Sequence, residues 1–187
     1  MKYTTLDSNL FIRNRELLSR KLDNKSIAIF NSNDVMPTNS DGTMPFKQNS
    51  DLFWLTSVDQ EESVFVMIKH NDLIKEILFL KETNEHIAIW EGAKLTKDKA
   101  NKNSGIQQVY WLTEMEKIIH NEIIGLEKIY LNKNMHSRST SEVQTRDDRF
   151  RETMMSQFPN KEIKEIAPIM HELRFIKSDL EVALIQH

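Results

Sequence analysis

A short polar cluster followed by two apolar runs constrains the fold of this chain most. Residues 49–51 read Asn-Ser-Asp, and their short side chains bond nearby backbone amides, which favours a turn or strand entrance. Residues 52–56 are few and rich in aromatic side chains, so they predict a mostly buried strand. After a polar connection at residues 59–62, residues 62–69 are rich in Val, Phe and Ile and predict a central strand. Residues 48–51 are interpreted as ending a loop and serving the backbone, in preference to a direct ligand contact.

Helices and strands alternate along the rest of the chain. Amphipathic spacing predicts a helix over residues 10–22, which Asp7 or Ser8 could cap. Thr113 and Glu116 have the spacing of a capping box at the start of another helix. Further helices are predicted over residues 94–103, 114–124 and 141–157, and strands over residues 26–30, 76–80, 108–112, 128–131 and 163–166. This order predicts a mixed α/β fold with a β-sheet of about six strands flanked by helices.

Two segments have features that a packed sheet does not require. Residues 31–47 form a long connection rich in Pro, Gly, Asn and Asp, and loops of this length inside a compact domain often have a function. Residues 141–157 carry many charges. Glu142 with Arg146, and Asp147 with Arg151, are four residues apart with the acid first, so each pair is predicted to stabilise a solvated surface helix by ~0.2–0.5 kcal/mol.

Composition excludes several classes of protein. The chain has 187 residues, a net charge of -3 and no Cys. It is long enough to form a core without disulfides, and its charge disfavours nucleic acid as a partner. A chain without Cys fits a reducing compartment, no apolar run approaches a membrane span, and the polar start is unlike a signal peptide. We therefore expect a cytoplasmic protein that does not enter a membrane.

The histidines do not predict a catalytic or metal site. His171-Glu172 begins like a zinc-protease signature, but Phe175 stands where the second histidine ligand is required. The segment that begins at Pro168 instead predicts a helix packed on the sheet. The other histidines lie in separate predicted elements without the spacing of a ligand set; they are His70, His86, His120 and His136. No catalytic residue and no metal ligand is therefore assigned to this chain.

Two segments of the sequence resemble one known family. The run from Met44 to Glu62, with its Gln-Asn-Ser-Asp, aromatic pair and Leu-Thr, resembles the N-terminal domain of the aminopeptidase P, prolidase and creatinase family. Residues 167–178 are similar to the joint between that domain and the catalytic domain. Lys47, Ser57 and Ala88 depart from the family pattern, which commonly has Arg, Gly and an acid there.

The resemblance implies a domain organisation. Residues 1–176 would be an accessory domain of ribonuclease H-like architecture, and residues 177–187 would start the first helix of a C-terminal metallopeptidase domain. Ser178 and Glu181 have the spacing of a capping box for that helix. The family's two divalent metal ions, expected to be manganese, are bound by two Asp, one His and two Glu of that later domain. This chain would itself hold no cofactor.

The segment Ile89-Trp90-Glu91-Gly92 is the candidate for function. Beside a glycine the chain can turn tightly and leave the indole of Trp90 partly exposed, although a Trp buried in the core fits the sequence equally well. Aminopeptidase P enzymes have a similar segment that approaches the active site of a neighbouring subunit. The resemblance therefore implies that Trp90 lines the substrate entrance of another subunit.

The function implied is that of an accessory domain. The parent would be a Xaa-Pro aminopeptidase, which removes the residue before proline, and this domain would shape the entrance for proline-containing peptides and form homo-oligomer contacts. Its partner would be the catalytic domain of the same chain. A prolidase N-terminal domain, or a non-catalytic peptide- or protein-binding module of the same architecture, remains the alternative.

Overall fold

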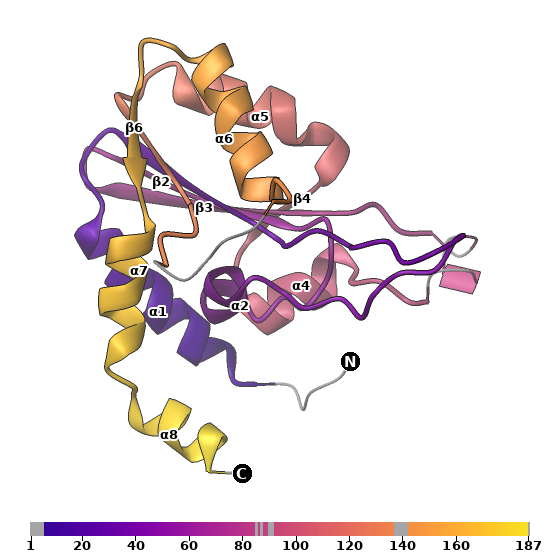
Figure 1. Ribbon diagram of the computed structural model, residues 1–187. Coiled ribbons are helices and arrows are strands. Elements are labelled where there is room, and N and C mark those ends of the chain that lie inside the picture. The colour runs from indigo at the N-terminus through magenta and orange to yellow at the C-terminus, as the bar shows by residue number, and fades with distance from the viewer. Residues whose placement is uncertain (1–5, 85, 87, 90–91, 137–141, 187) are drawn as a thin grey trace.

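A mixed six-stranded sheet forms the centre of the molecule. The computed structural model describes residues 6–84, 86, 88–89, 92–136 and 142–186 (Figure 1). The strands are β1 (Ser26–Asn31), β2 (Val64–His70), β3 (Leu73–Leu80), β4 (Gln108–Trp111), β5 (Lys128–Leu131) and β6 (Glu162–Glu165), in the spatial order β4-β3-β2-β1-β5-β6. β2 pairs antiparallel with β1 and β3, whereas the β1–β5, β3–β4 and β5–β6 pairs are parallel. The predicted mixed α/β fold is confirmed.

Helices cover both faces of the sheet. The helices are α1 (Ser8–Lys21), α2 (Ser50–Thr56), α4 (Lys97–Ser104), α5 (Met115–Ile123), α6 (Arg146–Gln157), α7 (Ala167–Phe175) and α8 (Asp179–Ile185). In Figure 1, α1, α2, α4 and α7 lie below the sheet, and α5 and α6 lie above it. No helix in the described part of the chain is long and apolar enough to cross a membrane.

The two faces of the sheet belong to two hydrophobic cores. In β1, Ala28 and Phe30 pack into the core shared with α1, α2 and α7, and Ile27 and Ile29 pack into the core shared with α5 and α6. Every residue of β1 is buried. A strand covered on both sides must be apolar at successive positions, which is why β1 and β2 read as continuous apolar runs.

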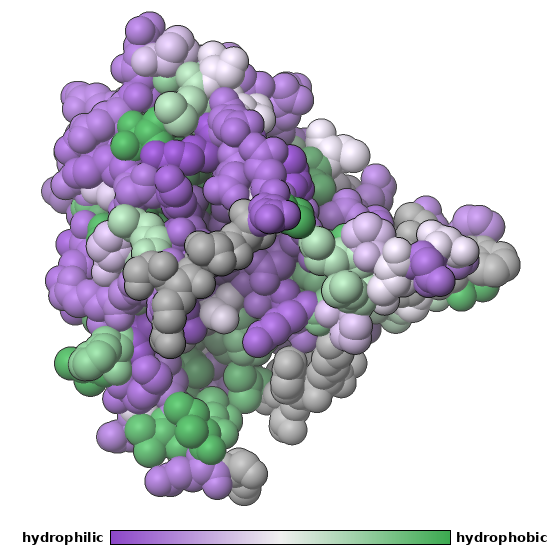
Figure 2. Space-filling model, viewed as in Figure 1, coloured by the Kyte–Doolittle hydropathy of each residue, from purple (hydrophilic) through white to green (hydrophobic). Residues whose placement is uncertain are grey.

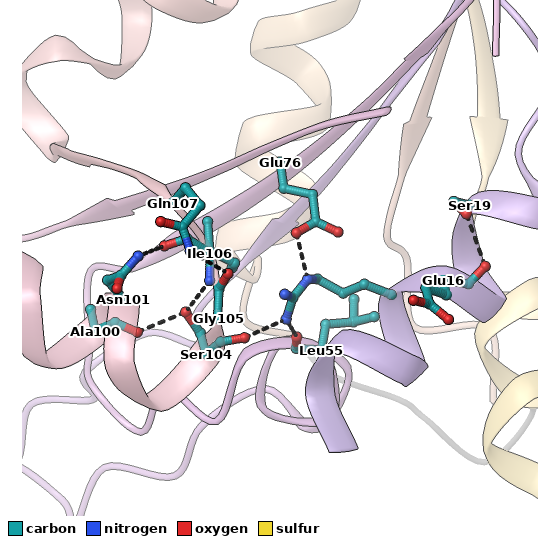
Figure 3. A network of polar contacts seen from close by, with 11 residues as sticks. Glu16, Ser19, Leu55, Glu76, Ala100, Asn101, Ser104, Gly105, Ile106 and Gln107 are labelled. Atoms are coloured by element: carbon teal, nitrogen blue, oxygen red, sulfur yellow. Dashed lines mark hydrogen bonds and ion pairs between the residues drawn. The ribbon is translucent and has the colours of Figure 1, made fainter. Parts of the chain in front are cut away.

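One fully buried arginine joins the helices below the sheet. Arg15 of α1 has 1% of its surface exposed. Its Nε donates to Glu76 Oε2 of β3 at 2.9 Å, and its Nη1 donates to the carbonyl oxygens of Leu55 at 2.9 Å and Ser104 at 2.8 Å. Figure 3 shows Glu76, Leu55 and Ser104 converging from three different elements. Burial lowers the pKa of Arg15, and the nearby Glu76 carboxylate opposes that effect. The arginine therefore ties α1 to β3, α2 and α4.

The strand predicted over residues 52–56 is wrong. These residues form α2, which begins at Ser50 after Asn49, whose side chain accepts the N–H groups of Asp51 and Leu52. The buried residues of α2 include Leu52 and Leu55, spaced as on one side of a helix. The polar cluster therefore caps a helix and does not introduce a strand.

Two further local predictions are also wrong. The residue at the N-cap of α5 is Glu114, whose side chain accepts the backbone N–H of Trp111 at 3.0 Å. No side chain caps α5, so the capping box predicted from Thr113 and Glu116 does not form. The charge pairs predicted for residues 141–157 are replaced by long-range contacts. The Nη1 of Arg146 donates to Ser32 Oγ at 2.7 Å, and Arg151 pairs with Glu165 of β6 at 2.7 Å.

The backbone of Ser57 leads to a prediction about stability. Ser57 ends α2 in the left-handed conformation, with φ 63° and ψ 4°. A side chain in this region costs about 1 kcal/mol relative to glycine. Ser57→Gly is therefore expected to raise the free energy of unfolding by about 0.5–1 kcal/mol, as measured by urea denaturation. Ser19→Gly, inside α1, is the matched control and should lower it by a similar amount. A loss of stability in Ser57→Gly would contradict the strain argument.

Candidate functional site

Trp90 lies outside the described residues, but residues on both sides of it are described. Ile89 is 74% exposed. Gly92 has a φ of 79°, and no heavy atom in the described part of the chain lies within 4 Å of a Cβ added there. The described residues Ile89 and Gly92, on either side of Trp90, are thus not packed against the core. The predicted entrance role of Trp90 stays a prediction.

Gln48, at the start of the polar motif, organises the chain on either side of α2. Its side chain is buried, and its Nε2 donates to the carbonyl oxygens of Val58 and Gln60 at 3.0 and 2.9 Å. Its Oε1 accepts the backbone N–H of Asn49 at 2.8 Å. The interpretation that Gln48 and Asn49 serve the backbone is confirmed.

Asp51 and Trp54 have a different role, because both contact the C-terminal helices. Asp51 Oδ1 accepts from Arg174 Nη1 of α7 at 2.5 Å. The indole Nε1 of Trp54 donates to Glu181 Oε1 of α8 at 2.7 Å. These contacts span 123 and 127 residues of sequence, so the spacing of residues in the motif could not reveal them. The segment that contains Asp51 and Trp54 therefore positions α7 and α8 on the domain.

Glu181 has two structural tasks. Its Oε2 accepts from the backbone N–H and hydroxyl of Ser178, and its Oε1 accepts from Trp54. Burial would raise the pKa of Glu181, but these hydrogen bonds outweigh that effect and lower it. The capping box predicted from Ser178 and Glu181 is confirmed, and its carboxylate also fixes α8 to α2.

An apolar groove lies where α8 approaches α1 and α2. Its volume is about 1070 Å³, and the side chains that line it include Leu10, Phe11, Phe53, Trp54 and Ile185. Figure 2 shows apolar residues gathered at the lower end of the molecule, over α8. Phe175, the last residue of α7, and Ile176, which follows it, are 84% and 80% exposed. This end of the molecule thus has the exposed apolar surface that is typical of an interaction site.

The described residues contain no metal centre. No group of three or more His, Cys, Asp or Glu side chains among them could hold a metal ion. His171, from the zincin-like segment, lies in α7, and His120 lies in α5 on the other face of the sheet, where its ring is 5.4 Å from that of Phe158. The described part of this chain therefore offers binding surfaces and no assembled catalytic metal site.

One acidic side chain has an environment that the sequence did not reveal. Asp147, in the first turn of α6, is partly buried, and burial raises its pKa to about 6. Asn31 Nδ2 donates to its Oδ1 at 2.9 Å, and this hydrogen bond and the charge of Arg146 offset the effect of burial only in part. A raised pKa in a cavity wall is a feature of functional sites.

A family model matches most of the chain. The model described as "Aminopeptidase P, N-terminal domain" matches residues 11–130. The chain is 24% identical to a Xaa-Pro aminopeptidase of Escherichia coli (strain K12) over 178 residues, which are 94% of this chain and 40% of that protein. It is 26% identical to the mitochondrial intermediate cleaving peptidase 55 of Arabidopsis thaliana over 180 residues, covering 94% of this chain and 34% of that protein. The chain thus spans well under half the length of these curated relatives.

Solved structures show the same fold. An aminopeptidase P from Bacillus anthracis superposes with a TM-score of 0.89 and 26% identity, covering 96% of this chain and 43% of that one. A zinc-substituted E. coli aminopeptidase P in complex with product superposes with a TM-score of 0.79 and 22% identity, covering 96% of this chain and 41% of that one. In each case the similarity covers nearly all of this chain and a minor part of the larger protein.

Proposed function

The chain belongs to the aminopeptidase P N-terminal domain family, and from this premise we propose that it is the accessory domain of a Xaa-Pro aminopeptidase. The observation that carries the proposal is the match to residues 11–130 together with two bacterial relatives named Xaa-Pro aminopeptidase, of which the chain covers 40% and 32%. The rest of such a protein would provide the catalytic domain. A prolidase parent is the alternative that the sequence left open.

The surface around α7 and α8 supports an interaction with that catalytic domain. Asp51 and Trp54 hold the two helices against α2. The apolar groove and the exposed Phe175 and Ile176 then lie at the end of the molecule from which the chain would continue. Residues 177–187 would start the first helix of the catalytic domain, and this boundary stays a prediction.

The proposed chemistry requires metal ions that this domain does not provide. The relative with substituted zinc is an aminopeptidase P that binds metal. In the parent of this chain, two divalent ions in the catalytic domain would activate water for attack on the bond before proline. Manganese as the metal, a homo-oligomer, proline-containing peptides as substrates and a cytoplasmic location stay predictions.

Hydrolysis measurements test the proposal directly. The 187-residue chain is expected to release no amino acid from a Xaa-Pro peptide, with or without manganese, because its described residues form no metal centre. The longer protein that includes a catalytic domain should release the first residue in a metal-dependent reaction. Release by the 187-residue chain itself, or failure of the metal-loaded longer protein to cleave such peptides, would overturn the proposal.

We also propose that Trp90 lines the substrate entrance of a neighbouring subunit. The exposure of Ile89 and the open space at Gly92 support this role. In the longer protein, Trp90→Ala is expected to lower the turnover of longer peptides about tenfold, or ~1.4 kcal/mol in the barrier. The melting temperature of the 187-residue chain should stay nearly unchanged, whereas truncating a buried Trp would cost ~3–5 kcal/mol.

Mixing subunits provides the control for the Trp90 experiment. Subunits that carry Trp90 but lack functional metal ligands should restore activity to Trp90→Ala subunits, because each entrance would be completed by its neighbour. Ile89→Ala is the matched variant one residue away and should leave the melting temperature unchanged, because Ile89 is exposed. A large fall in melting temperature for Trp90→Ala would show that the indole is part of the core.

A further inference from the structure

A polar cavity lies where the chain leaves the neighbouring strands β1 and β5 toward opposite faces of the sheet. β1 and β5 are parallel neighbours. After β1 the chain continues to α2 below the sheet, and after β5 it continues to α6 above it (Figure 1). In open α/β sheets, ligands bind in the crevice outside the carboxyl ends of strands at such a switch point. The topology thus identifies one preferred place for a ligand.

The crevice has the size of a small-molecule site. Its volume is about 690 Å³, within the range of about 300–1,000 Å³ for ligand pockets. Its walls include residues 32–34 after β1, residues 132–135 after β5 and the first turns of α2, α6 and α7. The long connection over residues 31–47, which the sequence suggested to be functional, therefore supplies part of the wall.

The acids in the crevice differ in their partners. Asp51 pairs with Arg174, and Asp34 pairs with Arg149. Asp147 has no ion pair of this kind, and its Oδ2 accepts no hydrogen bond from the described residues. Asn31, whose Nδ2 donates to Asp147 Oδ1, is only 3% exposed, and its own buried Oδ1 has no partner among the described residues. Arg146 also lines the crevice and its charge acts on Asp147, but its Nη1 donates to Ser32 Oγ at 2.7 Å. The wall thus offers Asp147 Oδ2 as an acceptor without a donor among the described residues.

The remaining charged residues of the crevice are cations. Lys47 and Lys133 line it, and both are exposed. Neither forms an ion pair with another residue in the described part of the chain. The exposed His171 of α7 also lines the crevice. These residues favour a negatively charged group at the mouth, whereas Asp147 favours a positively charged donor further in.

We propose that the crevice binds a small zwitterion, a free α-amino acid or a short peptide, with its ammonium group on Asp147 and its carboxylate near Lys47 and Lys133. The two ends of such a ligand complement the two ends of the crevice. The ammonium would supply the donor that Asp147 Oδ2 lacks. This proposal stands apart from the proposed function, since it concerns binding by this chain and requires no hydrolysis.

Calorimetric titration of the 187-residue chain tests the proposal. Leucine and the dipeptide Leu-Pro are the probes, and comparison of the two shows whether the site takes an amino acid or a peptide. Removing one charge with N-acetyl-leucine or leucinamide should weaken binding about tenfold or more, equivalent to losing one charge-assisted contact. These blocked ligands test each end of the site without any mutation.

Variants with matched controls locate the site. Asp147→Asn should weaken binding of the better probe about tenfold, whereas Glu152→Gln, an exposed acid on the same helix, should not. Lys133→Met should weaken binding, whereas Lys117→Met, in α5, should not. The proposal is overturned if neither zwitterion binds at millimolar concentration, if the blocked ligands bind equally well, if the control variants lose as much affinity, or if inorganic phosphate or Mg²⁺ binds while the zwitterions do not.

Discussion

Replacing Arg15 by alanine is expected to lower the free energy of unfolding by about 3–5 kcal/mol, because a buried charged network would lose its central member. The carbonyl oxygens of Leu55 and Ser104 would lose their donor, and Glu76 would lose its counterion. An unsatisfied buried acceptor costs about 1–3 kcal/mol. Truncation would also leave a cavity between α1 and its neighbours.

Urea denaturation of matched variants measures the effect of Arg15. Arg20→Ala, at an exposed position of the same helix, should change the free energy of unfolding by less than about 0.5 kcal/mol. Arg15→Lys should lie between the two, because lysine keeps the charge but lacks the planar fork that reaches several acceptors. A loss below about 1 kcal/mol in Arg15→Ala would show that the network contributes little.

Replacing Asp147 by asparagine is expected to stabilise the chain above pH 7. Burial raises the pKa of Asp147 from 3.8 to about 6, so the folded state binds this proton more tightly than the unfolded state does. The loss of free energy of unfolding caused by the buried carboxylate charge is absent below pH 4, grows between pH 4 and pH 6, and is complete above pH 6. Asparagine avoids that cost, and the expected gain at pH 8 is about 2–3 kcal/mol at most.

The pH dependence of the Asp147 variant distinguishes this cause from others. The difference between Asp147→Asn and the unmodified chain should shrink toward zero as the pH falls to 4. Asp148→Asn, at the next position, should behave in the opposite way. Hydrogen bonds from Thr145 lower the pKa of Asp148, so its substitution should cost stability at pH 8 and less as the pH falls through the lowered pKa. An advantage of Asp147→Asn that does not change with pH would contradict the proposed cause.

The two expectations for Asp147 together describe a conflict between stability and binding. The same substitution that is expected to stabilise the fold is expected to weaken binding of a zwitterion. Residues that serve ligand binding commonly reduce stability. Gain of stability without loss of affinity would separate the two roles and place the ligand, if one binds, elsewhere.

The sequence predicted the sheet well because burial on both sides leaves a strong pattern. β1 contains an apolar run over residues 27–30 and β2 one over residues 64–68, and such runs are short for a helix and typical of buried strands. α2 was missed because its seven residues contain two aromatic side chains, which are typical of strands. The signal that could have identified it is Asn49 as a cap, with Leu52 and Leu55 three residues apart.

The candidate sites were less predictable, because they depend on contacts between distant residues. Arg146 was expected to pair with Glu142, but it contacts Ser32 and Asp34, which are 114 and 112 residues away. Asp147 was assigned to a solvated helix face, and only the fold shows that it is partly buried beside Asn31. Local spacing predicts only the partners within one helix. Tertiary packing decides whether a side chain bonds to those partners or to residues of other elements.

The hydrogen bond between Trp54 and Glu181 also fixes the direction of the α8 axis relative to α2. Glu181 accepts from the indole through Oε1 and caps α8 through Oε2, so one carboxylate links the start of α8 to α2. Any structure that follows α8 would therefore be held in a defined orientation relative to α2. Its orientation relative to the sheet would be set by a tryptophan that lies 127 residues earlier in the chain.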